Sequence, residues 1–240
     1  MRIKKQEKKE PDIPLSTAEL LRRVDFFSDL NEAALSRFER MATVQSFQNE
    51  ETIVLAGDAR KAIFFITKGQ AKIFYDSKYS RSSILSLLGV GDFFGEIQLL
   101  NESGKSYLSV IADGECTVII FPGRNFINEM MNISELSYLF LKETVKKLNR
   151  AYMQTASLAM NTIRGRIKAC LMQFIDERGV RIQYKNESAI KLKNRPTQQQ
   201  IAEMSGTSRE TVNRELAVLI KDGYMELGNN DLILLKELPK

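Results

Sequence analysis

The chain has 240 residues with no histidine and two cysteines, and 43% of the residues are apolar and 27% charged. The missing histidine excludes Ser-His-Asp triads and His-ligated metals, and two cysteines cannot build a four-cysteine iron–sulfur site within one chain. The formal net charge is +5, and residues 161–240 carry 14 Lys and Arg against 10 Asp and Glu. This basic C-terminal third hints at a phosphate-bearing partner. No apolar run approaches ~18–20 residues and no signal peptide is recognisable, so we expect a cytoplasmic protein without membrane contact.

The first forty residues or so comprise a predicted polar tail followed by two predicted helices. Residues 1–14 are rich in Lys and Glu and contain two prolines, which predicts a flexible basic tail. Ser16 or Thr17 can then cap a short helix. Apolar residues at helical spacing predict a further helix over 30–41.

From Val44 onward, short β-rich runs alternate with turn residues. The expected strands are Thr52–Leu55, Ala62–Thr67, Ala71–Tyr75, Ser83–Leu88, Tyr107–Ile111 and Cys116–Phe121. Turns are expected at 57–58, 68–69, 89–92 and 113–114. This spacing indicates an antiparallel sandwich or barrel of the jelly-roll kind, which we assign to residues 15–131. Both cysteines, Cys116 and Cys170, fall in predicted core positions and are expected to be structural.

Residues 132–160 form one predicted long helix with a heptad seam. The seam residues recur at alternating steps of four and three: Leu141, Val145, Leu148, Tyr152, Thr155 and Ala159. Two interpretations remain open, a helix packed on its own barrel and a parallel dimer through the seam. The regular spacing, with basic side chains off the seam, favours the dimer. Helix continues over 162–175 with Gly165 as a candidate hinge, and an irregular hairpin is expected over 182–192.

The stretch after residue 195 predicts a helix-turn-helix. Thr197 caps a first helix, Gly206 ends it, and Ser208 caps a second one. The second helix buries Val212, Leu216 and Leu219 and directs other side chains outward from its first two turns: Arg209, Glu210, Asn213 and Arg214. A hairpin follows over 223–234, with a two-residue turn of positive φ expected at Asn229-Asn230. Residues 161–240 are therefore expected to form a winged helix-turn-helix.

Two motifs together resemble the Crp/Fnr (cyclic-AMP receptor protein-like) family of transcription regulators over roughly residues 20–235. They are the glycine-containing segment Gly91-Asp92-Phe93-Phe94-Gly95-Glu96-Ile97 and the helix Ser208-Arg209-Glu210-Thr211-Val212-Asn213-Arg214. The resemblance implies an α+β fold with a jelly-roll-like cyclic-nucleotide-binding β-roll, a long dimerisation helix and a C-terminal winged helix. It also implies a homodimer that binds double-stranded DNA and works with RNA polymerase, and not an enzyme. The sign of regulation stays open.

The resemblance assigns base reading to the second helix. Arg209, Glu210 and Arg214 would read a half-site resembling TGTGA, since an arginine fork pairs with guanine and a glutamate accepts from cytosine. Asn213 stands where the family has a small residue, which leaves the reading of the central bases open. Thr197 and Gln199 are expected on phosphates, and Ser208 completes the predicted DNA surface.

The effector site matches the family only in part. Gly95, Glu96 and Ile97 fit the first half of the phosphate cassette, but the second half holds Lys105 and Ser106 in place of the family's arginine. In the family, a Thr-Ser pair on the long helix contacts the adenine, and this pair aligns with residues 151–152. We therefore add Tyr152 and Thr155 to the predicted effector-binding residues. Lysine lacks the planar fork of arginine. Three alternatives remain: another small molecule such as a different nucleotide, weak cyclic AMP binding through Lys105, or a degenerate pocket in an effector-independent regulator. No metal or firmly assigned cofactor is expected.

Overall fold

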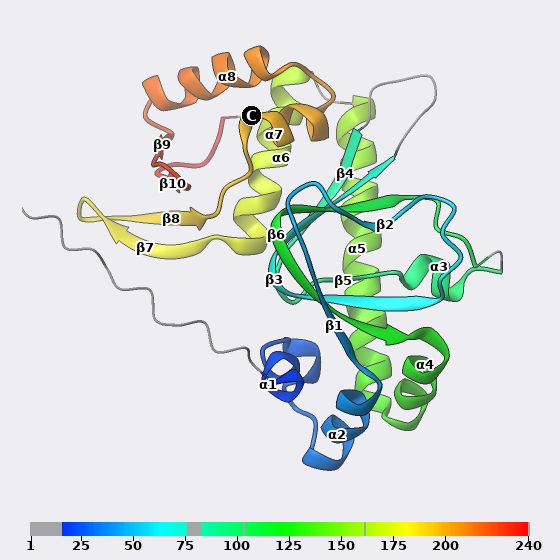
Figure 1. Cartoon of the computed structure of the whole chain (residues 1–240). Helices are drawn as coiled ribbons and strands as arrows, with labels where there is room; N and C mark the ends of the chain where they lie inside the picture. The colour runs from blue at the N-terminus through cyan, green and yellow to red at the C-terminus, as the bar shows by residue number, and fades with distance from the viewer. Residues whose placement is uncertain (1–15, 76–82, 103, 161, 240) are drawn as a thin grey trace, which may run out of the picture.

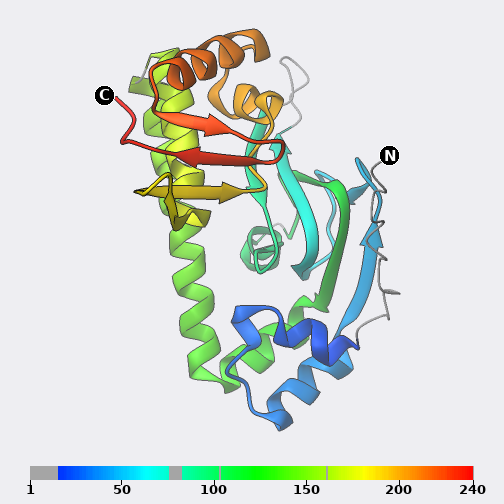
Figure 2. The ribbon, with the colours of Figure 1, turned by 90° about the vertical axis from the view of Figure 1, so that its left-hand side faces the viewer.

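The computed structural model describes residues 16–75, 83–102, 104–160 and 162–239, so the predicted tail over 1–14 lies outside the described residues. A β-roll occupies the centre, helices cover its lower end, and a small region of helices and strands lies above it (Figure 1). The long helix α5 runs past the roll from the lower helices to the upper region (Figure 2). No helix in the described ranges is long and apolar enough to span a membrane.

The lower helices begin at predicted caps. Ser16 caps α1 (Thr17–Arg22) in a reciprocal capping box with Glu19, as the sequence predicts for one of its two candidates. A 3-10 turn (Asp25–Phe27) and α2 (Glu32–Met41) follow, and α4 (Gly123–Asn132) comes after the roll. Their buried faces meet α5 in a cluster rich in phenylalanine.

All strand pairs in the roll are antiparallel, as predicted. The strands are β1 (Thr43–Phe47), β2 (Thr52–Val54), β3 (Ala62–Tyr75), β4 (Ser83–Leu88), β5 (Phe93–Phe94) and β6 (Ser109–Pro122). The order is β1-β6-β3-β4, with β2 paired to β6 and β5 to β3. The short helix α3 (Glu96–Leu100) directly follows β5.

Two predicted turns prove to be bends inside long strands. The chain continues as β3 through Lys68-Gly69 and as β6 through Asp113-Gly114. Gly69 has φ +79° and Gly114 φ +80°, and the β3–β6 register shifts on both sides of Lys68. A positive-φ glycine within a bulge bends a strand without ending its ladder, so the turn prediction was wrong here.

Successive side chains of β3 point to opposite faces of the strand and pack into two different apolar clusters. Ile63 and Phe65 join the phenylalanine cluster against the helices, whereas Phe64 and Ile66 face the interior of the roll. Cys116, also in the interior cluster, is fully buried, and burial raises the pKa of its thiol to about 11. Cys170 is buried in the C-terminal region, where desolvation raises its pKa to about 12. Both positions agree with the predicted structural role.

The long helix begins two residues later than predicted. α5 spans Ser134–Met160 because Ile133, in an extended conformation, separates it from α4. Thr162 caps the next helix, α6 (Ile163–Arg178), and accepts a hydrogen bond from the backbone N–H of Gly165. Gly165 therefore lies within the first turn of α6, and the helix boundary falls at Thr162 rather than at the candidate hinge.

The C-terminal region combines two capped helices with a four-stranded sheet. The helices are α7 (Gln198–Ser205) and α8 (Arg209–Lys221), and the strands are β7 (Val180–Tyr184), β8 (Glu187–Lys193), β9 (Met225–Leu227) and β10 (Asp231–Leu234). The sheet order β7-β8-β10-β9 joins both predicted hairpins.

The turn of the second hairpin differs from its prediction. The Gly228 N–H donates to the Asp231 carbonyl, which leaves Asn229 and Asn230 as the two-residue turn that was predicted, but neither residue has positive φ. The positive-φ pair lies instead at 185–186, between β7 and β8.

This C-terminal region is fastened to the edge of the β-roll. Ile84 and Leu87 of β4 belong to its apolar cluster, and β4 reaches α7 in both views (Figures 1 and 2). The Gln200 side chain donates to Asp113 Oδ2 at 2.6 Å, and Arg178 donates to the Leu87 carbonyl at 3.1 Å. The two regions thus share both apolar and polar contacts.

Candidate functional site

The turn between α7 and α8 is set by local contacts. Thr197 and Gln200 form a capping box at the start of α7. Gly206 ends that helix with φ +60° and ψ +47°, a left-handed conformation that favours glycine. The Ser208 hydroxyl then accepts from the Thr211 N–H at 3.2 Å and starts α8. These caps confirm the predicted helix-turn-helix.

One face of α8 is buried and the other is free to meet a partner. Val212, Leu216 and Leu219 are at most 3% exposed, so they anchor the helix. The predicted base-reading residues are all exposed on its first two turns: Arg209, Glu210, Asn213 and Arg214. Hydrogen bonds from its own backbone N–H and from the Ser208 hydroxyl lower the pKa of Glu210, so this carboxylate is ionised and ready to accept hydrogen bonds.

The predicted phosphate contacts lie at the start of α7. Thr197 and Gln199 are exposed there, and the Gln199 amide donates to Glu203 at 2.6 Å. Behind the reading face, Arg164 of α6 binds Glu215 of α8 at 2.6 Å. The ion pair holds α8 against α6 from the side opposite its outward residues.

A second candidate site is a cavity of about 200 Å³ within the β-roll. Its apolar walls come from the strands, from α3 and from the segment that follows α3: Val54, Ile73, Phe94, Ile97, Leu108 and Val110. The remaining lining residues are Gly95, Glu96, Gln98, Ser106 and Tyr107. The structure therefore brings together four predicted effector residues, Gly95, Glu96, Ile97 and Ser106.

Gly95 is required by both conformation and space. It precedes α3 with φ +101°, and a Cβ there would lie 2.4 Å from the Ala62 carbonyl oxygen. Any other residue would combine left-handed strain with a backbone clash. The predicted motif is thus explained by close approach of the cassette to β3.

The Glu96 carboxylate is bound by a lysine that sequence reasoning did not place in the site. Lys147 of α5 lies 3.1 Å from Glu96, donates to the Phe93 carbonyl, and stands 3.7 Å from the centre of the Phe93 ring. Burial lowers the pKa of Lys147, although the Glu96 charge opposes that shift. This contact connects the cavity wall directly to the long helix.

Three predicted effector residues do not line the cavity. Lys105 is exposed, and Tyr152 and Thr155 lie on an exposed face of α5. Ser106 lines it, but its hydroxyl donates to the Leu108 carbonyl at 2.6 Å. No lysine or arginine of the described chain is among the lining residues.

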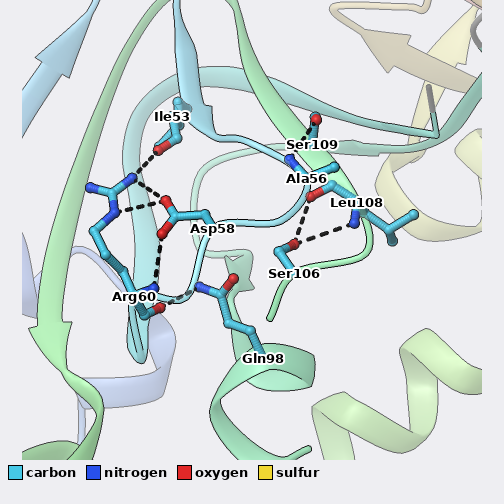
Figure 3. A network of polar contacts seen from close by, with 8 residues as sticks. All are labelled: Ile53, Ala56, Asp58, Arg60, Gln98, Ser106, Leu108 and Ser109. Carbon is cyan, nitrogen blue, oxygen red and sulfur yellow. Dashed lines mark hydrogen bonds and ion pairs between the residues drawn. The ribbon is translucent and has the colours of Figure 1, made fainter. Parts of the chain in front are cut away.

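A polar network includes Gln98, one of the residues that line the cavity (Figure 3). Arg60 binds Asp58 at 2.7 Å and donates to the Ile53 carbonyl at 3.1 Å. The hydrogen bond from Arg60 lowers the pKa of Asp58. The Arg60 carbonyl in turn accepts from the Gln98 side chain at 2.9 Å. Gln98 was missed from sequence, although a lone amide among apolar residues of α3 was the available signal.

A larger hollow of about 630 Å³ lies between α5 and α6, and its apolar wall includes Met153, Leu158 and Met172. The α5 seam itself is exposed: Leu141 is 61%, Val145 54% and Leu148 50% exposed. The seam does not pack on the protein's own barrel. No described group of three or more Cys, Asp or Glu side chains is placed to hold a metal ion.

Comparisons with known proteins match both candidate sites. The cyclic nucleotide-binding domain family matches residues 44–132, and the Crp-like helix-turn-helix domain family matches residues 165–240. The chain is 23% identical over 216 residues to a CRP-like cAMP-activated global transcriptional regulator of Mycobacterium tuberculosis, covering 90% of this chain and 94% of that one.

Two further similarities also extend over most of the chain. The cAMP-activated global transcriptional regulator Vfr of Pseudomonas aeruginosa is 27% identical over 188 residues, 77% of this chain and 86% of that protein. The structure of a CooA mutant from Carboxydothermus hydrogenoformans matches with a TM-score of 0.71 and 21% identity, covering 88% of each chain. This structural likeness confirms the predicted α+β fold.

Proposed function

The chain belongs to the Crp/Fnr family of transcription regulators, and we propose that it binds a pseudo-palindromic DNA site as a homodimer. The observation that carries the proposal is the exposed polar face of α8, which begins with Arg209 and Glu210 directly after the capped turn. Arg209 and Arg214 would pair with guanines and Glu210 with a cytosine of a TGTGA-like half-site. Asn213 would face the central bases, and Thr197, Gln199 and Ser208 would hold the backbone.

The exposed seam of α5 supports the homodimer. Its apolar side chains would be covered by the same seam of a second copy. No seam residue is among the described residues that line the hollow between α5 and α6, so the hollow is not part of this interface. A dimer would place two α8 helices one DNA turn apart, about 34 Å. By family membership the DNA-bound dimer would act with RNA polymerase, and we assign it no catalytic step.

The β-roll cavity supports gating by a small-molecule effector. Lys147 ties the Glu96 segment to α5, so a ligand that moves the cavity wall would change the position of the dimer helix. A ligand shifts that equilibrium only by its differential affinity for the two arrangements. The curated relatives are described as cAMP-activated. A cyclic nucleotide is therefore one candidate effector.

An effector-independent regulator is the second candidate. It is favoured by the absence of lysine and arginine among the cavity's described lining residues, because an anionic phosphate would find no counter-ion there. In that case the β-roll would serve only to present the dimer helix and the winged region.

A titration of a labelled TGTGA palindrome with the full chain, with and without cyclic AMP, tests both candidates. Salt must be fixed, because counterion release dominates non-specific affinity. Specific binding tightened by cyclic AMP supports nucleotide gating. Specific binding that cyclic AMP leaves unchanged argues against nucleotide gating. Equal affinity for the palindrome and a scrambled duplex in both conditions overturns the proposed half-site.

A further inference from the structure

The β-roll cavity has the size and walls of a site for one small ring. A cavity of about 150 Å³ lined by aliphatic and aromatic side chains is large enough to bind benzene. The volume here is about 200 Å³, and six of its lining residues are apolar. The space therefore suits a single ring with a small substituent.

Charge in and around the cavity is already balanced. Glu96 is the one carboxylic acid among the described lining residues, and Lys147 binds it from α5. Arg60, whose carbonyl accepts from the lining residue Gln98, is bound through its side chain to Asp58 and to a backbone carbonyl. Lys105 is exposed and does not line the cavity. A phosphate anion placed there would be desolvated without a cation of its own, which is strongly unfavourable.

One buried acceptor in the wall has no partner. Gln98 is 2% exposed, and its Nε2 donates to the Arg60 carbonyl, which fixes the orientation of the amide. Its Oε1 has no hydrogen-bond partner among the described residues. Figure 3 shows this oxygen turned away from Arg60, on the side of Ser106. An unsatisfied buried acceptor is costly, so a ligand that donates to it would relieve that cost.

We infer that this cavity takes a small, uncharged, single-ring aromatic molecule whose O–H or N–H donates to Gln98 Oε1, rather than a cyclic nucleotide. The inference rests on the proposed effector gating, because it names the chemical class of that effector. Apolar side chains would surround the ring, and the donor would complete the amide of Gln98. Phe94 lies in the wall beside Phe93, whose carbonyl and ring bind Lys147. A bound ring would thus contact the strand that connects the cavity to α5.

Calorimetric titration of the full chain with p-cresol, toluene and cyclic AMP tests the ligand class. The two aromatic probes have nearly the same size, but only p-cresol can donate a hydrogen bond. We expect p-cresol to bind about 3–10-fold more tightly than toluene, and cyclic AMP more weakly than either. Equal affinity for the aromatic probes, tighter binding of cyclic AMP, or no aromatic binding at millimolar concentration overturns the inference.

A pair of variants assigns the preference to one side chain. Gln98→Met removes the acceptor at similar length and should abolish the preference for p-cresol while leaving toluene binding intact. Gln183→Met, on an exposed strand position, is the control and should bind like wild type. A preference that persists in Gln98→Met overturns the role of Gln98. The wild-type comparison of probes stands even if this variant does not fold.

Adding p-cresol to the DNA titration separates the ligand from the gating. If calorimetry shows p-cresol binding and DNA affinity changes as well, both the ligand class and the gating are supported. If calorimetry shows p-cresol binding but DNA affinity does not change, the ligand class is supported. The proposed gating of DNA binding by that ligand is then overturned. The two failures are therefore distinguishable.

Discussion

The DNA-reading helices and the β-roll cavity are assembled on different length scales. The proposed reading surface lies within residues 197–214, and the helix caps there are made by residues three positions apart. The cavity combines residues from 54 to 110 on separate strands with a lysine from α5. A local surface can exchange its outward side chains without disturbing its frame. In the cavity, the same residues are both wall and support, so a substitution there changes shape as well as chemistry.

The largest expected difference is in the loss of stability when each of two glycines is replaced by alanine. Gly95→Ala at the cavity combines positive φ with a Cβ 2.4 Å from the Ala62 oxygen, whereas a Cβ at Gly206 meets its nearest described neighbour at 3.8 Å. We expect Gly95→Ala to lower the free energy of unfolding by about 3 kcal/mol and Gly206→Ala by about 1 kcal/mol. Urea denaturation monitored by circular dichroism measures both. Equal losses would show that the cavity is no more tightly built than the turn.

Arg209→Ala should affect recognition and not folding. Loss of one arginine fork should weaken binding to the matched half-site by about 2 kcal/mol, near 30-fold, with little discrimination left at that base pair. Arg23→Ala, at an exposed position near the N-terminus, controls for net charge and should leave DNA affinity unchanged. The affinities of wild type and variants for duplexes substituted at single base pairs are the measurement. A uniform loss on all sequences would reduce Arg209 to a phosphate contact.

The cap of the reading helix can be compared with a cap in the β-roll region. Ser208→Ala and Ser16→Ala each remove a side-chain acceptor from a helix N-terminus, at a cost of about 1 kcal/mol in unfolding free energy. Only Ser208→Ala should also weaken DNA binding, because it loosens the first turn of α8. If Ser16→Ala weakens DNA binding equally, stability alone accounts for the effect.

The smallest expected effect concerns the two cysteines. Burial raises the pKa of Cys116 to about 11 and that of Cys170 to about 12. At pH 8 the folded chain should therefore react slowly with a thiol reagent, and both thiols should react once it unfolds. Since deprotonation is easier in the unfolded state, their contribution to stability should fall as pH rises from about 8.5 toward these values. Fast reaction of the folded protein would contradict the burial of both side chains.

Local patterns predicted the helix-turn-helix well. Thr197, Gly206 and Ser208 each carry a capping preference that neighbouring residues do not override. The spacing of Val212, Leu216 and Leu219 likewise identified the buried face of α8. The α5 seam also follows from spacing, although its dimer remains a proposal.

Long-range packing limited prediction of the cavity. Nothing near Lys147 in sequence indicates that it reaches Glu96, because the two residues are 51 positions apart. The bends at Gly69 and Gly114 were mistaken for turns, since the same residue types serve both structures. Of the two predicted replacements for the family's arginine, Ser106 lines the cavity and Lys105 does not, and no local sequence pattern distinguishes them.

Gln200 uses both ends of its side-chain amide. The oxygen accepts from the Thr197 N–H at 2.7 Å, and the nitrogen donates to Asp113 of the β-roll at 2.6 Å. A carboxylate from the roll therefore lies at the first turn of α7, where the helix dipole favours negative charge. A DNA phosphate bound beside Thr197 would bring the same sign of charge to the same helix end. If the proposed phosphate contact at Thr197 forms, Asp113 would compete with DNA for this helix end, and DNA binding through α7 would exchange one anion for another.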